Sequence, residues 1–522
     1  MPTTEMRTRP FVLIIRDGWG ENPHPDLQQY DATLLAQTPV DGYLQKTYSH
    51  CLIATSGEDV GLPAGTMGNS EVGHQNIGAG RIVYQESMRL TQAIRGESFF
   101  SNEALLKAVN LCKANKSKLH LLGLVSNAGV HSLMDHLYGL LELAKRNAFD
   151  EVYLHAFTDG RDTPPRSGLA YLENVEEKMA EIGVGQVASV VGRFYSMDRD
   201  HRWQRVEKAY HLLRHGKGRK FKGIREVMED SYDRDVTDEF VEPACLVDGA
   251  GQPRACVSDG DAVIFFNFRG DRPRELTRTF VDSDFTGFNR GVRPDVYFVC
   301  MTQYDATIKT PVAFTKVARM KNTTGAYLSD LGLKQFRCAE TEKYPHVTFF
   351  FNDYTEPPFK GESRQIVPSP KVETYDQKPE MSAYEVTEVM LKQLDKGKVD
   401  FYVLNYANPD MVGHTGDLQA ATKAAEVVDE CVGKVLDRLK ALGGSAIVTA
   451  DHGNLEKMYD PETDSPMTSH TLYTVPLYIV DEKYGQCPLR TDGRLADVVP
   501  TAFHVMGIEK PAEMTGASLI IE

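Results

Sequence analysis

Short apolar runs recur along the chain, and each is followed by a polar corner that carries glycine, asparagine or aspartate. Apolar runs of roughly four to eight residues with such borders are typical of buried strands. The segments with this pattern are FVLIIRDG, KLHLLGLVSNAG, EVYLHAFTDGRD, QVASVVGRF, DAVIFFNFRG, DVYFVCMTQYD, DFYVLNYANPD and SAIVTADHG. Helical periodicity occurs between them at residues 133–147 and 382–397, the second with Ser382 as its expected N-cap. The alternation predicts an α/β fold with mostly parallel sheets.

The length of the chain predicts more than one domain. It has 522 residues, and single hydrophobic cores stop growing at about 250–300 residues. We expect the chain to cross between domains near residues 82–85 and 310–316. Residues 1–84 and 317–522 would then form one discontinuous domain, and residues 85–316 would form a second α/β domain inserted into it. Ligands of open α/β sheets bind at the carboxyl ends of the strands, so the polar corners are candidate site residues.

Composition and charge exclude several classes of protein. Hydrophobic residues make up 41% of the chain and charged residues 25%, which is ordinary globular usage. A formal net charge of −15 disfavours binding to nucleic acid or to anionic membranes. The apolar runs are shorter than the ~18 residues of a membrane span, and the N-terminal MPTTEMRTRP is not followed by the apolar region of a signal peptide. The eight scattered cysteines form no C-x-x-C pair, so we expect reduced thiols and a cytoplasmic location.

Carboxylates and histidines with the character of metal ligands lie near both ends of the chain. They are Asp17, Asp410, His414, Asp451, His452 and His470. Asp410 and His414 are four residues apart, which places both on one face of a helical turn, where His470 could complete a site. Asp17, Asp451 and His452 could hold a second cation. Oxygen and imidazole ligands without thiolate suit Mn²⁺, Mg²⁺, Co²⁺ or Zn²⁺. Any one of these residues alone would more simply be a cap or a turn former, but the set favours a metal site.

Ser70 is a candidate nucleophile. It lies in the glycine-rich corner GTMGNSEVGH, where a helix could begin. The free amides and dipole of a helix N-terminus favour an arriving phosphate. A neighbouring divalent cation would activate the serine hydroxyl, which is otherwise a weak nucleophile. The alternative is that Ser70 only caps this helix.

Arginines at the ends of apolar strands in the middle of the chain indicate an anion pocket. Guanidinium groups bind both phosphate and carboxylate in bidentate geometry. The alternative is surface pairing with the interleaved aspartates. The arginines are Arg161, Arg193, Arg199, Arg269 and Arg272.

Three further residues are candidates for proton transfer or charge stabilisation. Asp162, beside the arginines, could act as a general acid and base. His131, in SNAGVHS, is a second candidate for this chemistry. Lys343, in AETEKYPHVTFF, could offset charge on a phosphoryl group during transfer. For His131 and Lys343 a structural role is equally compatible with the sequence.

In this order, the motifs closely resemble those of the cofactor-independent phosphoglycerate mutases, two-domain members of the alkaline phosphatase superfamily. The likeness runs nearly from end to end. Its most specific stretches are MGNSEVGHQNIGAGR, SNAGVHS, FTDGRDTPP, MDRDHRW, FNFRGDR, ETEKYPHVTFFFN, VPSPKVETYD, NPDMVGHTGD and TADHGN. Three positions depart from the family pattern: Arg16 stands where an apolar residue is usual, Asp353 replaces a glycine, and Asn405 with Tyr406 opens the NPD segment.

The resemblance implies a phosphatase-like domain with a mostly parallel sheet and an inserted substrate-binding domain. It implies a monomer that interconverts 3-phosphoglycerate and 2-phosphoglycerate without 2,3-bisphosphoglycerate, using two divalent metal ions, with Mn²⁺ as the leading expectation. One metal would be held by Asp410, His414 and His470, and the other by Asp17, Ser70, Asp451 and His452. Ser70 would accept the phosphoryl group with Lys343 in support. Asp162 would act as acid and base near His131, and substrate would be held by Arg161, Arg193, Arg199, Arg269 and Arg272.

Three other functions fit parts of this pattern. A metal-dependent phosphohydrolase would share Ser70 and the metals but would not need the arginine-bearing domain. A mutase of sugar phosphates would use the same chemistry, although the arginine set suits a carboxylate better. A catalytically silent binding or scaffold protein would not need a complete set of ligands and nucleophile.

Overall fold

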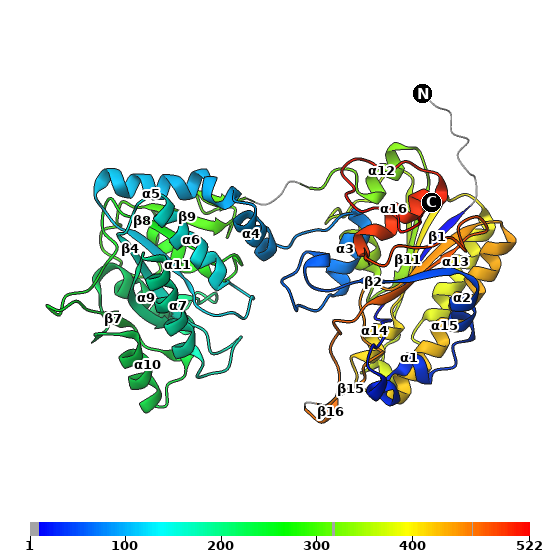
Figure 1. Cartoon of the computed structure of the whole chain (residues 1–522), viewed down its shortest axis with the longest axis horizontal. Coiled ribbons are helices and arrows are strands. Elements are labelled where there is room, and N and C mark those ends of the chain that lie inside the picture. Colours follow the sequence, from blue (N-terminus) through cyan, green and yellow to red (C-terminus); the bar gives the residue numbers. More distant parts are fainter. Residues whose placement is uncertain (1–9, 316–318, 462, 522) are drawn as a thin grey trace. The chain divides into compact units, whose positions relative to one another are not determined.

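The computed structural model describes residues 10–315, 319–461 and 463–521. By their contacts these residues form two compact units, which are Met1–Tyr84 with Ala318–Glu522, and Gln85–Val317. Figure 1 shows each unit as a sheet with its own helices. The boundary expected at 316/317 lies outside the described residues. Residues 1–9, to which the expectation about a signal peptide applies, also lie outside them.

The discontinuous unit is built on an eight-stranded sheet. β17 runs antiparallel to its neighbours, and the other strand pairs are parallel. In spatial order the strands are β12 (Glu362–Val367), β11 (Gln335–Glu340), β13 (Phe401–Tyr406), β1 (Phe11–Arg16), β14 (Ser445–Thr449), β17 (Val475–Val480), β2 (Ser49–Ala54) and β18 (Gly493–Arg494).

Helices cover this sheet on both sides, which explains its apolar central strands. Every residue of β1, β13 and β14 is buried, as expected for parallel strands with two covered faces. In Figure 1, α13 and α15 pack together on one side and α3 and α16 lie on the other. The helices of this unit are α1 (Ala32–Leu35), α2 (Pro39–Thr47), α3 (Ser70–Ala79), α12 (Thr324–Asp330), α13 (Ala383–Lys396), α14 (Asn408–Gly413), α15 (Leu418–Ala441) and α16 (Val498–Met506).

The inserted unit contains a second eight-stranded sheet with a separate core. Its strands β7 and β6 run against the direction of the others. In spatial order they are β10 (Val312–Phe314), β9 (Tyr297–Thr302), β8 (Ala262–Phe265), β3 (Leu119–Leu124), β4 (Val152–Thr158), β5 (Gln186–Gly192), β7 (Ala244–Leu246) and β6 (Arg219–Phe221). Its helices are α4 (Glu86–Arg95), α5 (Glu103–Asn115), α6 (Met134–Arg146), α7 (Gly168–Ile182), α8 (Arg193–Ser196), α9 (Trp203–His215), α10 (Ile224–Asp233) and α11 (Pro273–Val281).

The predicted α/β class and the parallel character of the sheets are confirmed. Each apolar segment that predicted a strand forms one, and the two predicted helices correspond to α6 and α13. The prediction that Ser382 is the N-cap residue is confirmed in position. This residue holds the N-cap position of α13, but its side chain makes no cap hydrogen bond. Its Oγ instead donates to the carbonyl oxygen of Pro368 at 2.8 Å.

Two global expectations can be compared with the described residues. All eight cysteines are free thiols, and most are buried. None of the described helices combines the length and apolar character needed to cross a bilayer.

Candidate active site

Four adjacent strands direct polar residues to one edge of the sheet in the discontinuous unit. β11, β13, β1 and β14 are neighbours and run in parallel. Lys343, Asp410, Asp17 and Asp451 follow these strands in that order, so the topology brings together residues more than 400 positions apart. All four side chains are buried. The strand ends therefore gather three carboxylates around one ammonium group.

Ser70 begins α3 beside these groups. Its Oγ lies 3.2 Å from Asp17 Oδ1 and 3.0 Å from His452 Nε2. Lys343 Nζ donates to the same Oγ at 2.6 Å. The alternative in which Ser70 caps the helix is wrong, because Asn69 is the N-cap and its side chain accepts a hydrogen bond from the amide of Val72. The Ser70 hydroxyl is therefore oriented by groups outside its own helix.

The imidazoles complete two overlapping clusters of possible metal ligands. Ligand atoms of Asp410, His452 and His470 lie within 4.8 Å of one another, and so do those of Asp17, Asp451 and His452. The ring of His452 stacks on that of His470 with centroids 3.8 Å apart. Beside the first cluster, His414 Nε2 lies 3.1 Å from Asp410 Oδ1 and 3.1 Å from His470 Nε2. The helical turn of α14 thus puts His414 and Asp410 in contact, as their spacing predicts.

Buried negative charge is the main electrostatic feature of this site. Lys343 Nζ contacts Asp17 at 2.7 Å and Asp410 at 2.5 Å. Although burial opposes its charge, these two carboxylates hold the pKa of Lys343 above its usual value. Burial and the nearby Asp451 raise the pKa of Asp17. One ammonium cannot balance three buried carboxylates, and apart from a 3.1 Å contact of Asp451 Oδ2 with His74 Nδ1 the Asp451 carboxylate has no polar side-chain partner that satisfies it. This unmet demand for positive charge, with imidazole and carboxylate donors, fits divalent cations.

In the inserted unit, a buried arginine organises the loops after β4 and β5. Arg193 Nη1 donates to Asp159 Oδ1 and to Asp162 Oδ2, both at 2.6 Å. Asp159 Oδ1 also accepts the backbone amides of Arg161 and Asp162. Although burial opposes ionisation of Asp159, its hydrogen bonds and Arg193 lower its pKa. His131 Nε2 lies 3.7 Å from Asp162 Oδ2, and burial followed by Arg193 lowers the pKa of His131 to about 4.

The other four arginines of the predicted anion pocket are more exposed than Arg193. Asp271 accepts a hydrogen bond from Arg199 at 3.0 Å and lies 3.3 Å from Arg269 Nε. Burial lowers the pKa of Arg272, and the positive charges of Arg193, Arg199 and Arg161 lower it further. Mutual destabilisation of like charges is a property of a site that accepts an anion. The side chains of Arg161, Arg199 and Arg269 are about half exposed, at 54%, 48% and 53%.

Comparison with known proteins identifies the family. The description "BPG-independent PGAM N-terminus" matches residues 90–306, and "type I phosphodiesterase / nucleotide pyrophosphatase" matches residues 278–462. A 2,3-bisphosphoglycerate-independent phosphoglycerate mutase of Rhodopirellula baltica is 53% identical, with 99% of this chain and 98% of that protein covered. The chain belongs to this mutase family. The mutase of Moorella thermoacetica is also 53% identical, covering 98% of this chain and 99% of that protein.

The solved structures include a member of the same family. The chain is similar to the phosphoglycerate mutase of Leishmania mexicana, determined at low cobalt concentration, with 34% identity and a TM-score of 0.57. The similarity covers 100% of this chain and 99% of that chain. The resemblance to the mutase family and the predicted fold class are therefore confirmed.

Two departures from the mutase family pattern have local explanations. Asp353 adopts a positive φ of 50°, a conformation that glycine enters more readily. Its carboxylate accepts hydrogen bonds from the Gln75 side chain at 3.0 Å and from the Met320 amide at 2.6 Å. Arg16 is buried, donates to Asp41 at 2.5 Å and lies 4.2 Å from the Trp19 ring centroid. Both polar residues are thus held by partners away from Ser70.

Sequence reasoning missed several polar residues that support the mutase site. Asp159 follows β4 in the same corner as Asp162, so its position at a strand end was the available signal. His74 Nδ1 lies 2.9 Å from the carbonyl oxygen of Ser70, and Asn405 donates to Asp17. Asn405 lies within β13, where an isolated polar residue in a buried strand could have marked it. For His74 the available signal was its spacing of four residues from Ser70 in the predicted helix, which places both on one face.

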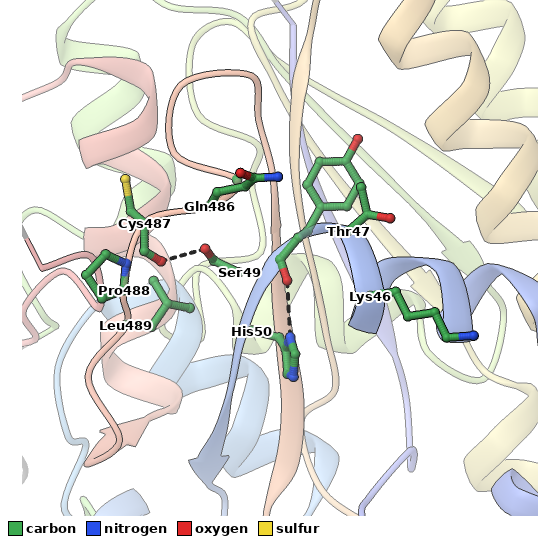
Figure 2. A pocket seen from close by; sticks show the side chains of 10 residues that line it. Lys46, Thr47, Ser49, His50, Gln486, Cys487, Pro488 and Leu489 are labelled. Carbon is green, nitrogen blue, oxygen red and sulfur yellow. Dashed lines mark hydrogen bonds between the residues drawn. The ribbon is translucent and has the colours of Figure 1, made fainter.

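A separate pocket lies at the opposite end of the same sheet. It has a volume of about 360 Å³ and is lined by residues around the start of β2 and by residues 485–489. Figure 2 shows the hydrogen bond from Ser49 Oγ to the carbonyl oxygen of Cys487. His50 Nδ1 lies 3.1 Å from the carbonyl oxygen of Tyr48. β2 runs parallel to β14 through the intervening antiparallel β17, so its first residues lie away from the carboxyl-end site. The pocket therefore does not contain the mutase candidate residues.

Proposed function

We propose that this chain interconverts 3-phosphoglycerate and 2-phosphoglycerate through a phosphorylated Ser70, without 2,3-bisphosphoglycerate. The position of Ser70 supports this proposal most directly. Its Oγ is held by Lys343, Asp17 and His452 at the N-terminus of α3. Free helical amides and a buried ammonium together favour a phosphoryl group at this oxygen.

Two divalent cations, with Mn²⁺ as the first expectation, are part of the proposal. Asp410, His414 and His470 would hold one, and Asp17, Ser70, Asp451 and His452 would hold the other. When bound, the cations would stabilise negative charge on the serine oxygen and on the phosphoryl group. His452 belongs to both clusters of possible ligands, which supports two cation sites that lie next to each other.

The reaction would proceed by two displacements at phosphorus. Ser70 Oγ, which enters and leaves the cycle as an alkoxide, attacks the phosphorus of 3-phosphoglycerate, the bond to the 3-oxygen breaks, and a protonated Asp162 delivers its proton to that oxygen. Glycerate then reorients, Asp162 removes the proton of the 2-hydroxyl, and that oxygen takes the phosphoryl group from Ser70. Two in-line displacements predict retention of configuration at phosphorus.

The arginines of the inserted unit would bind glycerate throughout the reaction. Arg161, Arg193, Arg199, Arg269 and Arg272 supply the positive charge for carboxylate and phosphate. Arg193 would also fix the proton-transfer carboxylate of Asp162, which it contacts at 2.6 Å. The inserted unit, residues 85–316, would thus be the substrate-binding domain, and the discontinuous unit would be the metal-binding, phosphatase-like domain. We further propose a cytoplasmic monomer.

A phosphohydrolase is the competing function. It would use the same serine and cations, with water in place of the 2-hydroxyl. The arginine cluster argues against it, because a hydrolase gains nothing by retaining its dephosphorylated product. Release of phosphate must instead be suppressed by keeping water from phosphoserine while glycerate turns.

The deciding experiment is turnover of 3-phosphoglycerate by metal-stripped protein in the absence of 2,3-bisphosphoglycerate. Mn²⁺, Mg²⁺, Co²⁺ and Zn²⁺ are added in separate reactions, and 2-phosphoglycerate and free phosphate are measured together. The proposal expects metal-restored 2-phosphoglycerate with little free phosphate. Free phosphate as the main product would establish a hydrolase, and no turnover with any metal would exclude this substrate.

A further inference from the structure

A buried histidine and a buried asparagine connect two carboxylates next to Ser70. Asn405 Nδ2 donates to Asp17 Oδ2 at 2.8 Å and lies 3.0 Å from His74 Nε2. On the other side of its ring, His74 Nδ1 lies 3.1 Å from Asp451 Oδ2 and 2.9 Å from the carbonyl oxygen of Ser70. Both side chains have no exposed surface. The contacts therefore form a continuous path from Asp17 through Asn405 and His74 to Asp451.

Hydrogen-bond chemistry fixes the direction of this path. The ionised carboxylate of Asp17 can only accept, so the Asn405 amide must turn its nitrogen toward it. The second proton of that nitrogen then points at His74 Nε2, which must accept it. His74 consequently carries its proton on Nδ1 and donates toward Asp451 and the Ser70 carbonyl oxygen. This tautomer accepts at Nε2 and donates from Nδ1, so Asn405 donates to Asp17 and His74 donates toward Asp451 while neither side chain adds net charge.

We propose that Asn405 and His74 are positioning residues that set the spacing of Asp17 and Asp451 for the cation beside Ser70. This inference rests on the proposed metal-dependent function and extends it to residues outside the ligand set. A neutral bridge is suited to this role because it orients the carboxylates and leaves their negative charge available to a cation. Groups of this kind behind metal ligands change metal affinity or activity by about 10–100-fold when mutated.

The cation bound by Asp410, His414 and His470 provides an internal comparison. No hydrogen bond of Asn405 or His74 among the described residues reaches any of these three side chains. Loss of the bridge should therefore weaken one of the two metal sites selectively. A general loosening of the domain would weaken both.

The key variant is Asn405→Asp, which keeps the size of the side chain. A carboxylate at this position repels Asp17 and can only accept from His74. It would reverse the tautomer of His74 and remove the proton directed at Asp451. His74→Leu removes both contacts, whereas His74→Asn retains a donor near the position of Nδ1. His50→Asn is the control, because His50 lies in the separate pocket of Figure 2.

The test is calorimetric titration of the metal-stripped full chain with Mn²⁺, combined with the melting temperature without metal and with steady-state kinetics. For Asn405→Asp and His74→Leu we expect one of two binding events to weaken about 10–100-fold and the other to remain unchanged. At limiting metal kcat should fall, with recovery at high metal and little change in the KM for phosphoglycerate. His74→Asn should lie between these variants and the wild type.

Several outcomes would overturn the inference. They are two binding events of wild-type affinity in both strong variants, equal weakening of both events, or a wild-type chain that binds no cation. If Asn405→Asp does not fold, the partial loss expected for His74→Asn decides. Selective loss of one metal from a chain that lacks mutase turnover would support the positioning role and refute the proposed function. Mutase turnover by the wild type with unchanged metal binding in the variants would support the proposed function and refute the positioning role.

Discussion

Ser70 is the side chain on which the proposed chemistry depends most directly. Ser70→Ala removes the oxygen that contacts Lys343, Asp17 and His452 but leaves these groups in place. We expect mutase activity to fall by on the order of 10⁴-fold or more, as for loss of a nucleophile. The measurement is turnover together with transfer of radioactive phosphate to the protein. Labelled protein should be absent from the variant.

Ser101→Ala is the matched control, since Ser101 is exposed and contacts only its own turn among the interactions described for it. It should keep wild-type turnover and labelling. Substantial activity in Ser70→Ala would remove the phosphoserine step from the mechanism.

Arg193 shows how charge and geometry can be separated at one position. A single nitrogen of its buried guanidinium contacts both Asp159 and Asp162. Arg193→Lys keeps the positive charge but replaces a planar group by a mobile ammonium. Small misplacement of a catalytic group can cost about 10²-fold in rate. We therefore expect kcat to fall by about that factor, with a smaller change in KM, measured by steady-state kinetics at saturating metal.

Arg214→Lys is a control of the same chemistry. Arg214 donates to the carbonyl oxygen of Val257 in the same unit and contacts none of the candidate site residues in its described hydrogen bonds. Equal losses in both variants would show that the effect of Arg193 is structural.

A row of polar side chains crosses three strands of the inserted sheet, β5, β4 and β3, and ends at Asp261, just before β8. Ser189 Oγ lies 2.8 Å from His155, His155 Nε2 lies 2.9 Å from His120, and His120 Nε2 lies 3.1 Å from Asp261. All four side chains are buried. Burial lowers the pKa of both histidines, and burial also lowers the pKa of His136, elsewhere in the same unit, to about 4. The row is satisfied with neutral rings, burial opposes protonation of either ring, and protonation of both would place two N–H groups against each other.

This row predicts that acid destabilises the inserted unit. Unfolded histidine takes up its proton near pH 6.5, whereas these folded histidines do so only at lower pH. Between these values the unfolded state binds more protons, so the free energy of unfolding decreases as pH falls below about 6.5. These histidines should leave the free energy of unfolding nearly constant from pH 7 to pH 8.

The two tryptophans allow this prediction to be measured, because Trp19 lies in the discontinuous unit and Trp203 in the inserted one. In Trp19→Phe, urea unfolding followed by Trp203 fluorescence should shift to lower urea between pH 7 and pH 5. The same shift should be smaller in a Trp19→Phe variant that also carries His155→Gln. Unfolding at Trp203 that does not change over this range would contradict the prediction.

Elements were predictable from sequence where local patterns determine them. β1 and β14 are short and wholly buried, so continuous apolar runs predicted them. The N-cap position of α13 was predictable, but the hydrogen bond of the Ser382 side chain was not, because its acceptor is the carbonyl oxygen of Pro368, outside the helix. The contact between Asn405 and His74 depends likewise on how β13 packs against α3. Ligand types could therefore be read from the sequence, but the residues that orient them could not.

The complete chain combines two units with different connectivity. The sheet of the discontinuous unit combines strands from both ends of the sequence. β1 and β2 come from the N-terminal segment, and their neighbours in the sheet come from the C-terminal segment. The inserted unit is one continuous segment with its own buried clusters. A domain of this kind can fold independently. Because the inserted unit is continuous in sequence, it can be produced without the other unit and its part of the proposed function can be measured alone.

Residues 85–315, produced alone, should fold and bind 3-phosphoglycerate without metal. The arginine cluster lies wholly in this segment, whereas Ser70 and all proposed metal ligands lie outside it. We expect cooperative unfolding reported by Trp203, phosphoglycerate binding in the presence of EDTA, and no turnover. Arg272→Gln should weaken binding by about 1.5–3 kcal/mol, the contribution of a hydrogen bond to a charged group. Calorimetry at two salt concentrations measures this, and binding should decrease at the higher salt because the attraction is electrostatic. A folded segment that does not bind phosphoglycerate would show that the arginines alone do not form the substrate site.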